Sequence, residues 1–182
     1  MAENSEKSVN DLRNLAASAQ EIAQGGLPPV HLWDPPFCGD MDLVIRADGS
    51  WIHEGRPINR PEMVRLFASI LKREGDAHFL VTPVEKLRIR VEDAPFLAVD
   101  VDHEGDRLVF ATNLGDRVVA GPENALTLGG TADRPRPYLH VRRGLQALID
   151  SKTFYRLAEM ARPGPDGRLS IRSDGHWMAL EP

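Results

Sequence analysis

A repeated seven-residue phrase constrains the fold of this 182-residue chain more than any other feature of the sequence. Segment 45–51 reads IRADGSW and segment 171–177 reads IRSDGHW, so five of the seven positions are identical. An Asp-Gly pair tolerates the positive φ values of a tight turn, and each copy therefore predicts a β-hairpin. In each hairpin the tryptophan is expected to anchor the return strand to a helix. The repeat favours two α+β halves built on one motif by duplication, with convergence of a common hairpin as the alternative.

Hydrophobic periodicity assigns elements to the N-terminal part of the chain. Apolar residues at helical spacing predict a helix over 8–24, and a proline-containing extended segment follows over 27–40. A hairpin over 41–58 leads into a second amphipathic helix over 60–73. Asn59 is expected to cap this helix together with a glutamate three residues later.

The C-terminal part of the chain alternates short apolar runs with turn residues. Several strands are predicted before residue 121, and the Gly-, Pro- and Thr-rich segment 121–136 is expected to be a loop. A further strand over 138–142 is followed by a predicted helical region over 144–161, with a bend at Ser151. Two short strands then complete the chain.

These elements predict an α+β protein with two structurally related halves, each an antiparallel sheet packed on a helix. The expected division is an N-terminal helical arm over 1–26, a first half over 27–84 and a second half over 85–182.

Composition limits the classes of function. The 22 basic and 27 acidic residues give a formal net charge of −5, which is atypical of a nucleic-acid-binding protein. No apolar run approaches the roughly 20 residues that span a bilayer, so no membrane association is expected. The single cysteine, Cys38, excludes an internal disulfide, and its occurrence without an export signal predicts a cytoplasmic protein.

The sequence contains none of the common catalytic fingerprints. The phosphate-binding loop, the dinucleotide-binding glycine pattern and the Gly-x-Ser-x-Gly nucleophile motif are all absent. The six histidines form no pair at helical ligand spacing, so no metal site and no cofactor are predicted. Cys38 and His53 are interpreted as a small apolar residue and an unrelated histidine rather than as a nucleophile and its base.

A basic cluster stands out in this acidic chain. It consists of Arg134, Arg136, His140, Arg142 and Arg143. Because the arginine fork suits phosphate and carboxylate groups, the cluster is typical of an anion-binding site. Ordinary ion pairing with the acidic segment 85–106 explains it equally well.

Three polar phrases at predicted strand ends carry a resemblance to a known family. They are DGSWIHEGRPI at 48–58, LVTPVEK at 80–86 and VEDAPF at 91–96. In these phrases the chain resembles an uncharacterised bacterial family, domain of unknown function 1285. The resemblance implies two related α+β halves, the second loosely similar to a pleckstrin-homology fold. It also implies a cleft between the halves that binds a nucleotide-like ligand, and a role in signalling; it supplies no catalytic residues.

The leading interpretation is a ligand-binding or regulatory module for a nucleotide-like or other anionic small molecule. Three cations are expected to meet phosphate charge: Arg56, Lys86 and Arg142. Glu85 and Asp93 are expected to accept hydrogen bonds from a base or sugar. The remaining expected ligand contacts are His53, Glu54 and Thr82.

Two alternatives remain open at the level of sequence. One is a protein-interaction adaptor that docks a partner through the N-terminal helix. The other, less favoured, is a hydrolase that uses His53 with Glu54 or Asp93 as an acid–base pair. A non-catalytic role is preferred because no motif in the sequence indicates a particular reaction.

Overall fold

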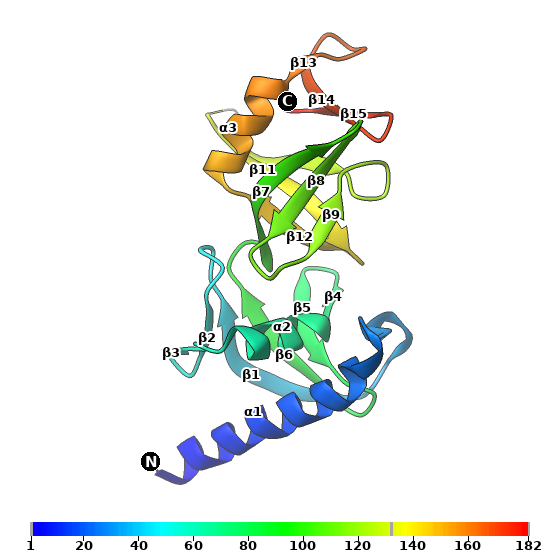
Figure 1. Ribbon diagram of the computed structural model, residues 1–182. Coiled ribbons are helices and arrows are strands. Elements are labelled where there is room, and N and C mark those ends of the chain that lie inside the picture. The colour runs from blue at the N-terminus through cyan, green and yellow to red at the C-terminus, as the bar shows by residue number, and fades with distance from the viewer. Residues whose placement is uncertain (1, 132, 182) are drawn as a thin grey trace. The chain divides into compact units, whose positions relative to one another are not determined.

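The computed structural model describes residues 2–131 and 133–181, and the chain divides into two compact units (Figure 1). The first unit comprises the chain up to Val44 together with Ser50–Val91. The second comprises Ile45–Gly49 and the chain from Glu92 onward. The two α+β halves predicted from the sequence are thus confirmed. The likeness of the second half to a pleckstrin-homology fold stays a prediction.

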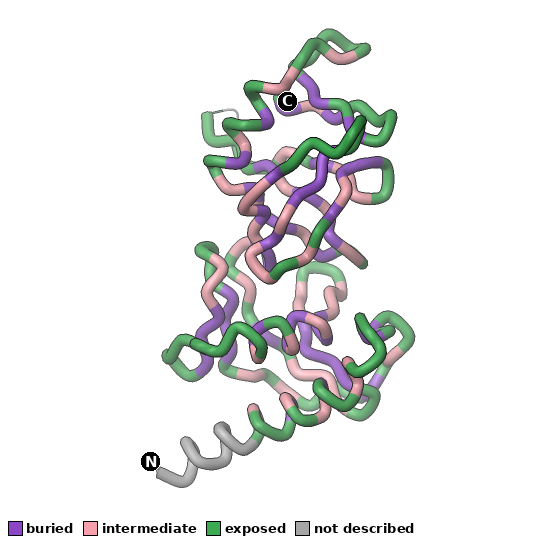
Figure 2. The backbone as a smooth tube through the Cα atoms, in the orientation of Figure 1, coloured by how far each residue is buried: buried purple, intermediate pink, exposed green. Residues whose placement is uncertain are grey.

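The first unit is a six-stranded sheet with two α-helices. Its strand order is β3-β2-β1-β6-β5-β4. The core of this unit includes Leu43, Phe67, Ile70 and Leu80, each fully buried (Figure 2). Its elements are α1 (Ala2–Ile22), two 3-10 turns (Ala23–Gly25 and Val30–Leu32), β1 (Phe37–Ile45), β2 (Trp51–His53), β3 (Arg56–Pro57), α2 (Pro61–Ser69), β4 (Leu71–Glu74), β5 (Ala77–Val81) and β6 (Lys86–Val91).

Helix α2 is shorter than the sequence predicted. It begins at Pro61, whose missing N–H suits the first turn, and Arg60 precedes it without a side-chain cap, so the expected Asn59 cap is wrong. The helix ends at Ser69, and Leu71 already pairs with Leu80 in the sheet. Ile70 and Leu71 fit a helical stripe in sequence, but both faces of the chain are covered here. Consecutive apolar residues are expected in a strand that is buried on both faces, so the start of β4 explains Ile70 and Leu71 as well as a helix would.

Helix α1 packs against α2 within the first unit. Leu15 and Ala19 on α1 are 1% and 0% exposed, so the thin apolar stripe of this helix is used inside the unit. No helix among the described residues is long and apolar enough to cross a membrane.

The second unit is a six-stranded sheet, one α-helix and a small third sheet of order β13-β14-β15. The strand order of the larger sheet is β10-β11-β12-β7-β8-β9. The elements are β7 (Phe96–Glu104), β8 (Arg107–Thr112), β9 (Arg117–Val119), β10 (Leu126–Thr131), β11 (Arg134–Arg142), β12 (Leu145–Ile149), α3 (Ser151–Met160), β13 (Arg162–Pro163), β14 (Leu169–Ser173) and β15 (His176–Ala179).

The two large sheets have the same topology. If the strands of each unit are numbered one to six along the chain, both sheets read 3-2-1-6-5-4. Each consists of two three-stranded meanders that meet at the first and the sixth strand. In the second unit these strands, β7 and β12, run parallel, so its sheet is mixed rather than antiparallel as predicted. The meanders are separate ribbons, and no tight turn forces their meeting strands to run in opposite directions.

Two assignments in the second half are wrong. The predicted loop 121–136 contains β10 and the start of β11, which pair antiparallel. The predicted helix over 144–161 begins as strand β12, where burial alternates from Leu145 to Ile149. Its apolar residues fit both helical and strand spacing, and pairing with β7 and β11 selects the strand. Helix α3 begins at Ser151, where the bend was predicted, and is capped by Asp150, whose carboxylate accepts a hydrogen bond from the Thr153 N–H at 2.8 Å.

The two copies of the repeated phrase lie in unlike surroundings. Trp51 is 2% exposed on β2 of a six-stranded sheet, whereas Trp177 is 37% exposed on β15 of the three-stranded sheet. By strand order, the counterpart of the β1–β2 pair in the second unit is β7–β8. The two units are therefore related by their strand order, and the two copies of the repeated phrase do not lie on equivalent strands.

The division between the units falls after Val91, whereas the sequence predicted a boundary after residue 84. Strand β6 explains the difference, because it lies between β1 and β5 in the sheet of the first unit. The short segment Ile45–Gly49 joins the second unit, where the Ala47 N–H donates to the Glu92 carboxylate at 3.0 Å.

The repeated glycines provide a matched test of these unlike surroundings. A Cβ at Gly49 (φ +85°) would lie 2.8 Å from the amide nitrogen of Asn113 and 2.9 Å from Leu97 Cδ1, whereas a Cβ at Gly175 (φ +74°) meets nothing within 4 Å. The Asn113 side chain is held by the Leu97 N–H at 2.9 Å, so it cannot move without losing that bond. We expect Gly175→Ala to cost about 1 kcal/mol of backbone strain and Gly49→Ala about 2–4 kcal/mol in urea unfolding. Equal losses would contradict the difference in packing.

Candidate functional site

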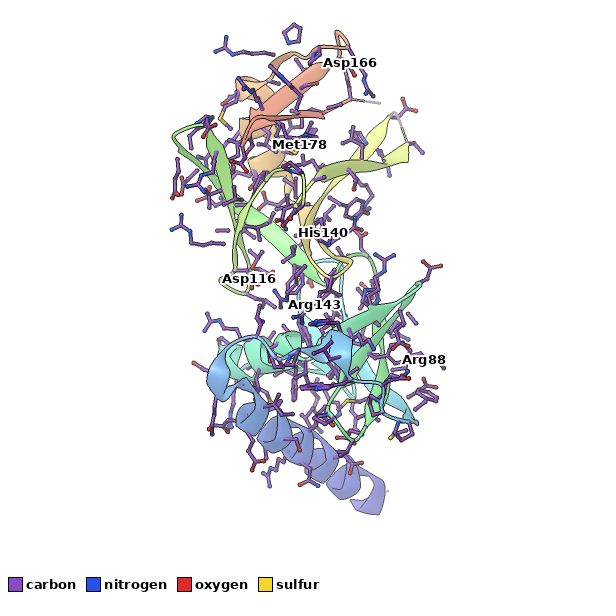
Figure 3. The ribbon with its side chains drawn as sticks, turned by 90° about the vertical axis from the view of Figure 1, so that its right-hand side faces the viewer. Arg88, Asp116, His140, Arg143, Asp166 and Met178 are labelled. Carbon is purple, nitrogen blue, oxygen red and sulfur yellow. The ribbon has the colours of Figure 1, made fainter. Side chains whose placement is uncertain are left out.

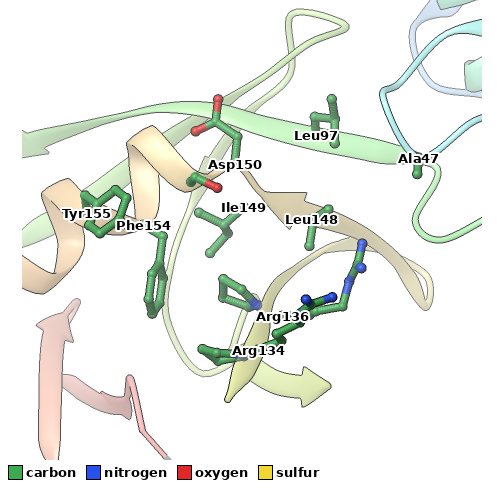
Figure 4. A pocket seen from close by; sticks show the side chains of 12 residues that line it. Ala47, Leu97, Arg134, Arg136, Leu148, Ile149, Asp150, Phe154 and Tyr155 are labelled. Carbon is green, nitrogen blue, oxygen red and sulfur yellow. The ribbon is translucent and has the colours of Figure 1, made fainter. Parts of the chain in front are cut away.

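A cavity of about 690 Å³ lies within the second unit (Figure 4). Eight of its twelve lining residues are apolar or aromatic, a composition and size typical of small-molecule sites. These eight are Ala47, Leu97, Pro135, Pro137, Leu148, Ile149, Phe154 and Tyr155. The polar part of the lining consists of Arg134, Arg136, Asp150 and Ser151.

Three elements position this lining. The parallel register of β12 with β7 places Leu148 opposite Leu97. The chain then turns at Asp150 into α3, which contributes Phe154 and Tyr155.

Strand β11 contributes Arg134 and Arg136, which are two residues apart and so project from the same side of the strand. The adjacent strand β10 approaches closely because Gly130 (φ +79°) has no side chain. A Cβ there would lie 2.4 Å from the Arg134 carbonyl oxygen.

The two arginines differ in their electrostatic surroundings. Arg136 donates to the carboxylate of Asp93, which also accepts a hydrogen bond from the Tyr138 hydroxyl at 2.6 Å. Burial raises the pKa of Tyr138, and the hydrogen bond to Asp93 raises it further, so the hydroxyl remains a donor. Among the described residues, Arg134 forms neither an ion pair nor a side-chain hydrogen bond. It is therefore the cation of this cavity that is available to a ligand.

Of the described residues that line this cavity, Asp150 is the one that is acidic. Its carboxylate is occupied by the Thr153 N–H at the start of α3. Figure 4 shows this carboxylate directed away from the side chains of Arg134 and Arg136. Asp150 therefore shapes the cavity mainly by capping the helix that forms its wall.

Three of the predicted site residues, His53, Glu54 and Glu85, gather elsewhere. They line a cavity of about 430 Å³ in the first unit, together with Cys38, which the sequence spacing had not associated with His53. Five carboxylates line this cavity, and one of them, Asp40, is paired with Arg88. Among the described residues no lysine or arginine lines it, so the excess negative charge disfavours an anion. Among the described residues, no group of three or more histidines, cysteines or carboxylates is arranged to hold a metal ion.

Other predicted contacts in the first unit take part in local structure. Lys86 pairs with Glu74 at 3.1 Å and lies over the Phe79 ring, 5.1 Å from its centroid. Thr82 is 1% exposed, and its hydroxyl accepts a hydrogen bond from the Glu85 N–H at 3.2 Å in the turn between β5 and β6. Arg56 is exposed on the edge strand β3.

Arg142 is also engaged within its own unit. Its guanidinium donates to Asp116 at 3.0 Å and lies 4.9 Å from the centroid of the Phe96 ring; Figure 3 marks Asp116. The side chains of Arg142 and Asp116 are 16% and 26% exposed. An ion pair stacked on a buried ring stabilises the sheet and leaves little of the guanidinium for a ligand.

Asp93 is thus the predicted residue that connects to the cavity of the second unit, and it does so through Arg136. The arginines themselves belong to the basic cluster seen in the sequence, where they alternate with prolines as RPRP at 134–137. The aromatic wall from α3 was missed. An amphipathic helix normally buries its rings in the core, and nothing in the sequence indicated that Phe154 and Tyr155 would line an open cavity.

Comparison with known proteins places the chain in a family. Residues 28–94 match the N-terminal domain, and residues 95–180 the C-terminal domain, of the family described as domain of unknown function 1285 (DUF1285). The chain belongs to the DUF1285 family. The resemblance noted in the sequence is confirmed. A search of curated proteins finds no significant match.

Two crystal structures of DUF1285 family proteins are similar to this chain. The protein from Silicibacter pomeroyi DSS-3 is 51% identical, with a TM-score of 0.83 over 92% of this chain and 94% of that one. The protein from Shewanella baltica OS155 is 31% identical, with a TM-score of 0.54 over 65% of this chain and 91% of that one.

The pairing of Lys86 with Glu74 predicts a pH dependence of stability. Hydrogen bonds from Lys86 and Lys72 lower the pKa of Glu74 below its ordinary value of 4.5. A carboxyl whose pKa is lowered by folding stabilises the native state above its unfolded pKa, and this contribution disappears as the pH falls through the folded pKa. We therefore expect Glu74→Gln to be less stable than the parent protein at pH 7, with the difference shrinking below pH 4.5.

Chemical denaturation across this pH range measures the effect. Asp76→Asn is the control, because the Asp76 side chain is fully exposed on the same hairpin. A difference between Glu74→Gln and the parent that is constant from pH 7 to pH 3 would show that Lys86 is not held by Glu74.

Proposed function

We propose that this DUF1285 protein is a binding module for an anionic small molecule, which it holds in the cavity of the second unit. The observation that carries the proposal is Arg134. It projects from β11 beside an apolar cavity of about 690 Å³ and has no ion-pair partner among the described residues. Arg134 is exposed, so an anion can reach its guanidinium without displacing a partner carboxylate.

Binding is favoured over catalysis by the composition of the lining. No histidine or cysteine is found among the described residues that line this cavity, and its carboxylate, Asp150, already accepts a backbone hydrogen bond. The acid–base pairs considered from sequence, His53 with Glu54 or Asp93, are not part of this lining. A regulatory role in the cytoplasm, with a nucleotide-like compound as one candidate ligand, is part of the same proposal.

The adaptor interpretation has less support. It requires a surface on the N-terminal helix that is available to a partner. The buried positions Leu15 and Ala19 show that the apolar stripe of α1 is engaged within its own unit. Docking of a protein through this helix therefore stays a prediction without a specific observation in its favour.

Thermal denaturation with added anions tests the proposal. The panel is inorganic phosphate, AMP and benzoate, each with the parent protein, Arg134→Ala and Arg172→Ala. Arg172 is an exposed arginine of β14 that does not line the cavity, which makes it a matched control. A ligand present at ten times its Kd stabilises by about 1.4 kcal/mol. For a chain of this length, that corresponds to a rise in Tm of roughly 3–5 °C.

We expect at least one anion to raise the Tm of the parent and of Arg172→Ala, and to have little effect on Arg134→Ala. The proposal is wrong if no anion stabilises the parent, or if the stabilisation survives unchanged in Arg134→Ala.

A further inference from the structure

We infer that the ligand of this cavity is an amphipathic monoanion, a compound with an apolar body and a single carboxylate-like group. This inference rests on the proposed function, and it narrows the class of ligand. Two arginines that line an apolar and aromatic cavity support it. The guanidinium of Arg134 has no ion-pair partner among the described residues, whereas that of Arg136 is paired with the carboxylate of Asp93.

The number of charges that the cavity can accept follows from the pairing of its arginines. Arg136 is neutralised by Asp93, which is itself fixed by the Tyr138 hydroxyl. The Asp93 side chain is 15% exposed and the Arg136 side chain 48% exposed, so the carboxylate is the more enclosed partner of this pair. Asp150 adds a further negative charge to the lining. Among the described residues that line the cavity, Arg134 therefore remains as the one cation without an ion-pair partner, and a second negative charge on the ligand would lack a partner.

The shape and chemistry of the walls favour an apolar body. Leu97, Leu148 and Ile149 line the cavity along the β7–β12 pair. Figure 4 shows the Phe154 ring directed from α3 toward the strand that carries Arg134. Tyr155 is 71% exposed although it is a large aromatic residue at this site. A flat apolar group would cover these surfaces and gain hydrophobic and ring-stacking contacts.

The anionic end of the ligand is expected to meet Arg134 at the end of the hairpin. An arginine fork binds a carboxylate through two parallel N–H···O bonds, which a neutral amide cannot reproduce. A nucleoside polyphosphate fits this arrangement poorly, because its several negative charges would meet one available cation and two carboxylates.

A charge series on one ring system tests the inference by isothermal titration calorimetry with the full chain. The compounds are 2-naphthamide, 2-naphthoate and 2,6-naphthalenedicarboxylate, which carry no, one and two negative charges. We expect 2-naphthoate to bind at least about ten-fold more tightly than either neighbour, the gain typical of a charge-assisted hydrogen bond. Arg134→Ala should remove this ten-fold preference, and Arg172→Ala should retain it.

A second variant tests the charge count independently. Asp93→Asn keeps an oxygen that accepts from Tyr138 but releases Arg136 from its counter-charge. We expect the affinity of this variant for the dicarboxylate to rise about ten-fold, while that for 2-naphthoate changes little. A dicarboxylate affinity that is the same in Asp93→Asn as in the parent would contradict the inference.

Dodecanoate and AMP complete the series and separate the sources of the ligand. Tighter binding of 2-naphthoate than of dodecanoate indicates an aromatic acid, and the reverse order indicates an acyl chain; both support the inference. Arg134-dependent binding of AMP or of the dicarboxylate that is tighter than that of 2-naphthoate overturns the inference and leaves the proposed function standing. If no anion binds in an Arg134-dependent manner, both are overturned.

Discussion

The pairing of β7 with β12 is the constraint on which the second unit depends. These strands join two three-stranded meanders into one sheet, and their parallel register sets Leu97 beside Leu148 and Ala98 beside Ile149. The bond from the Asp150 N–H to the Ala98 carbonyl, at 3.0 Å, extends the pairing to the residue that caps α3. One set of backbone hydrogen bonds thus places both the apolar floor of the cavity and the start of its helical wall.

Charge pairing decides which basic residues are available for recognition. Lys86 is held by Glu74, Arg142 by Asp116 and Arg136 by Asp93. Each of these partners is distant in sequence or lies on another strand. A guanidinium with a carboxylate beside it must exchange that partner for a ligand, whereas Arg134 has no such partner among the described residues and is not subject to that cost.

The two large sheets share one strand order, although the repeated phrase does not lie at equivalent strands of the two units. Both sheets read 3-2-1-6-5-4, yet α2 lies between the third and fourth strands of its unit and α3 follows the sixth strand of the other. The repeated phrase suggested two related halves, and two halves of one topology are present. The phrase nevertheless aligns β1–β2 with β14–β15, whereas topology aligns β1–β2 with β7–β8. Asp-Gly hairpins recur because the turn geometry demands them.

The local features could be predicted from the sequence: the α+β class, the turns at glycines, most strands and the basic cluster that includes Arg134 and Arg136. Alternation and turn chemistry act over a few residues, so they can be read along the chain. That 145–149 is a strand follows from sheet pairing, because its apolar residues fit both the helical and the strand period. The folded chain also places His53, Glu54 and Glu85 at a cavity of the first unit that no arginine among the described residues lines. It brings Asp93 to Arg136, which is 43 residues away in the sequence. Burial and ion pairing depend on which distant segments meet, and that information lies in the fold as a whole.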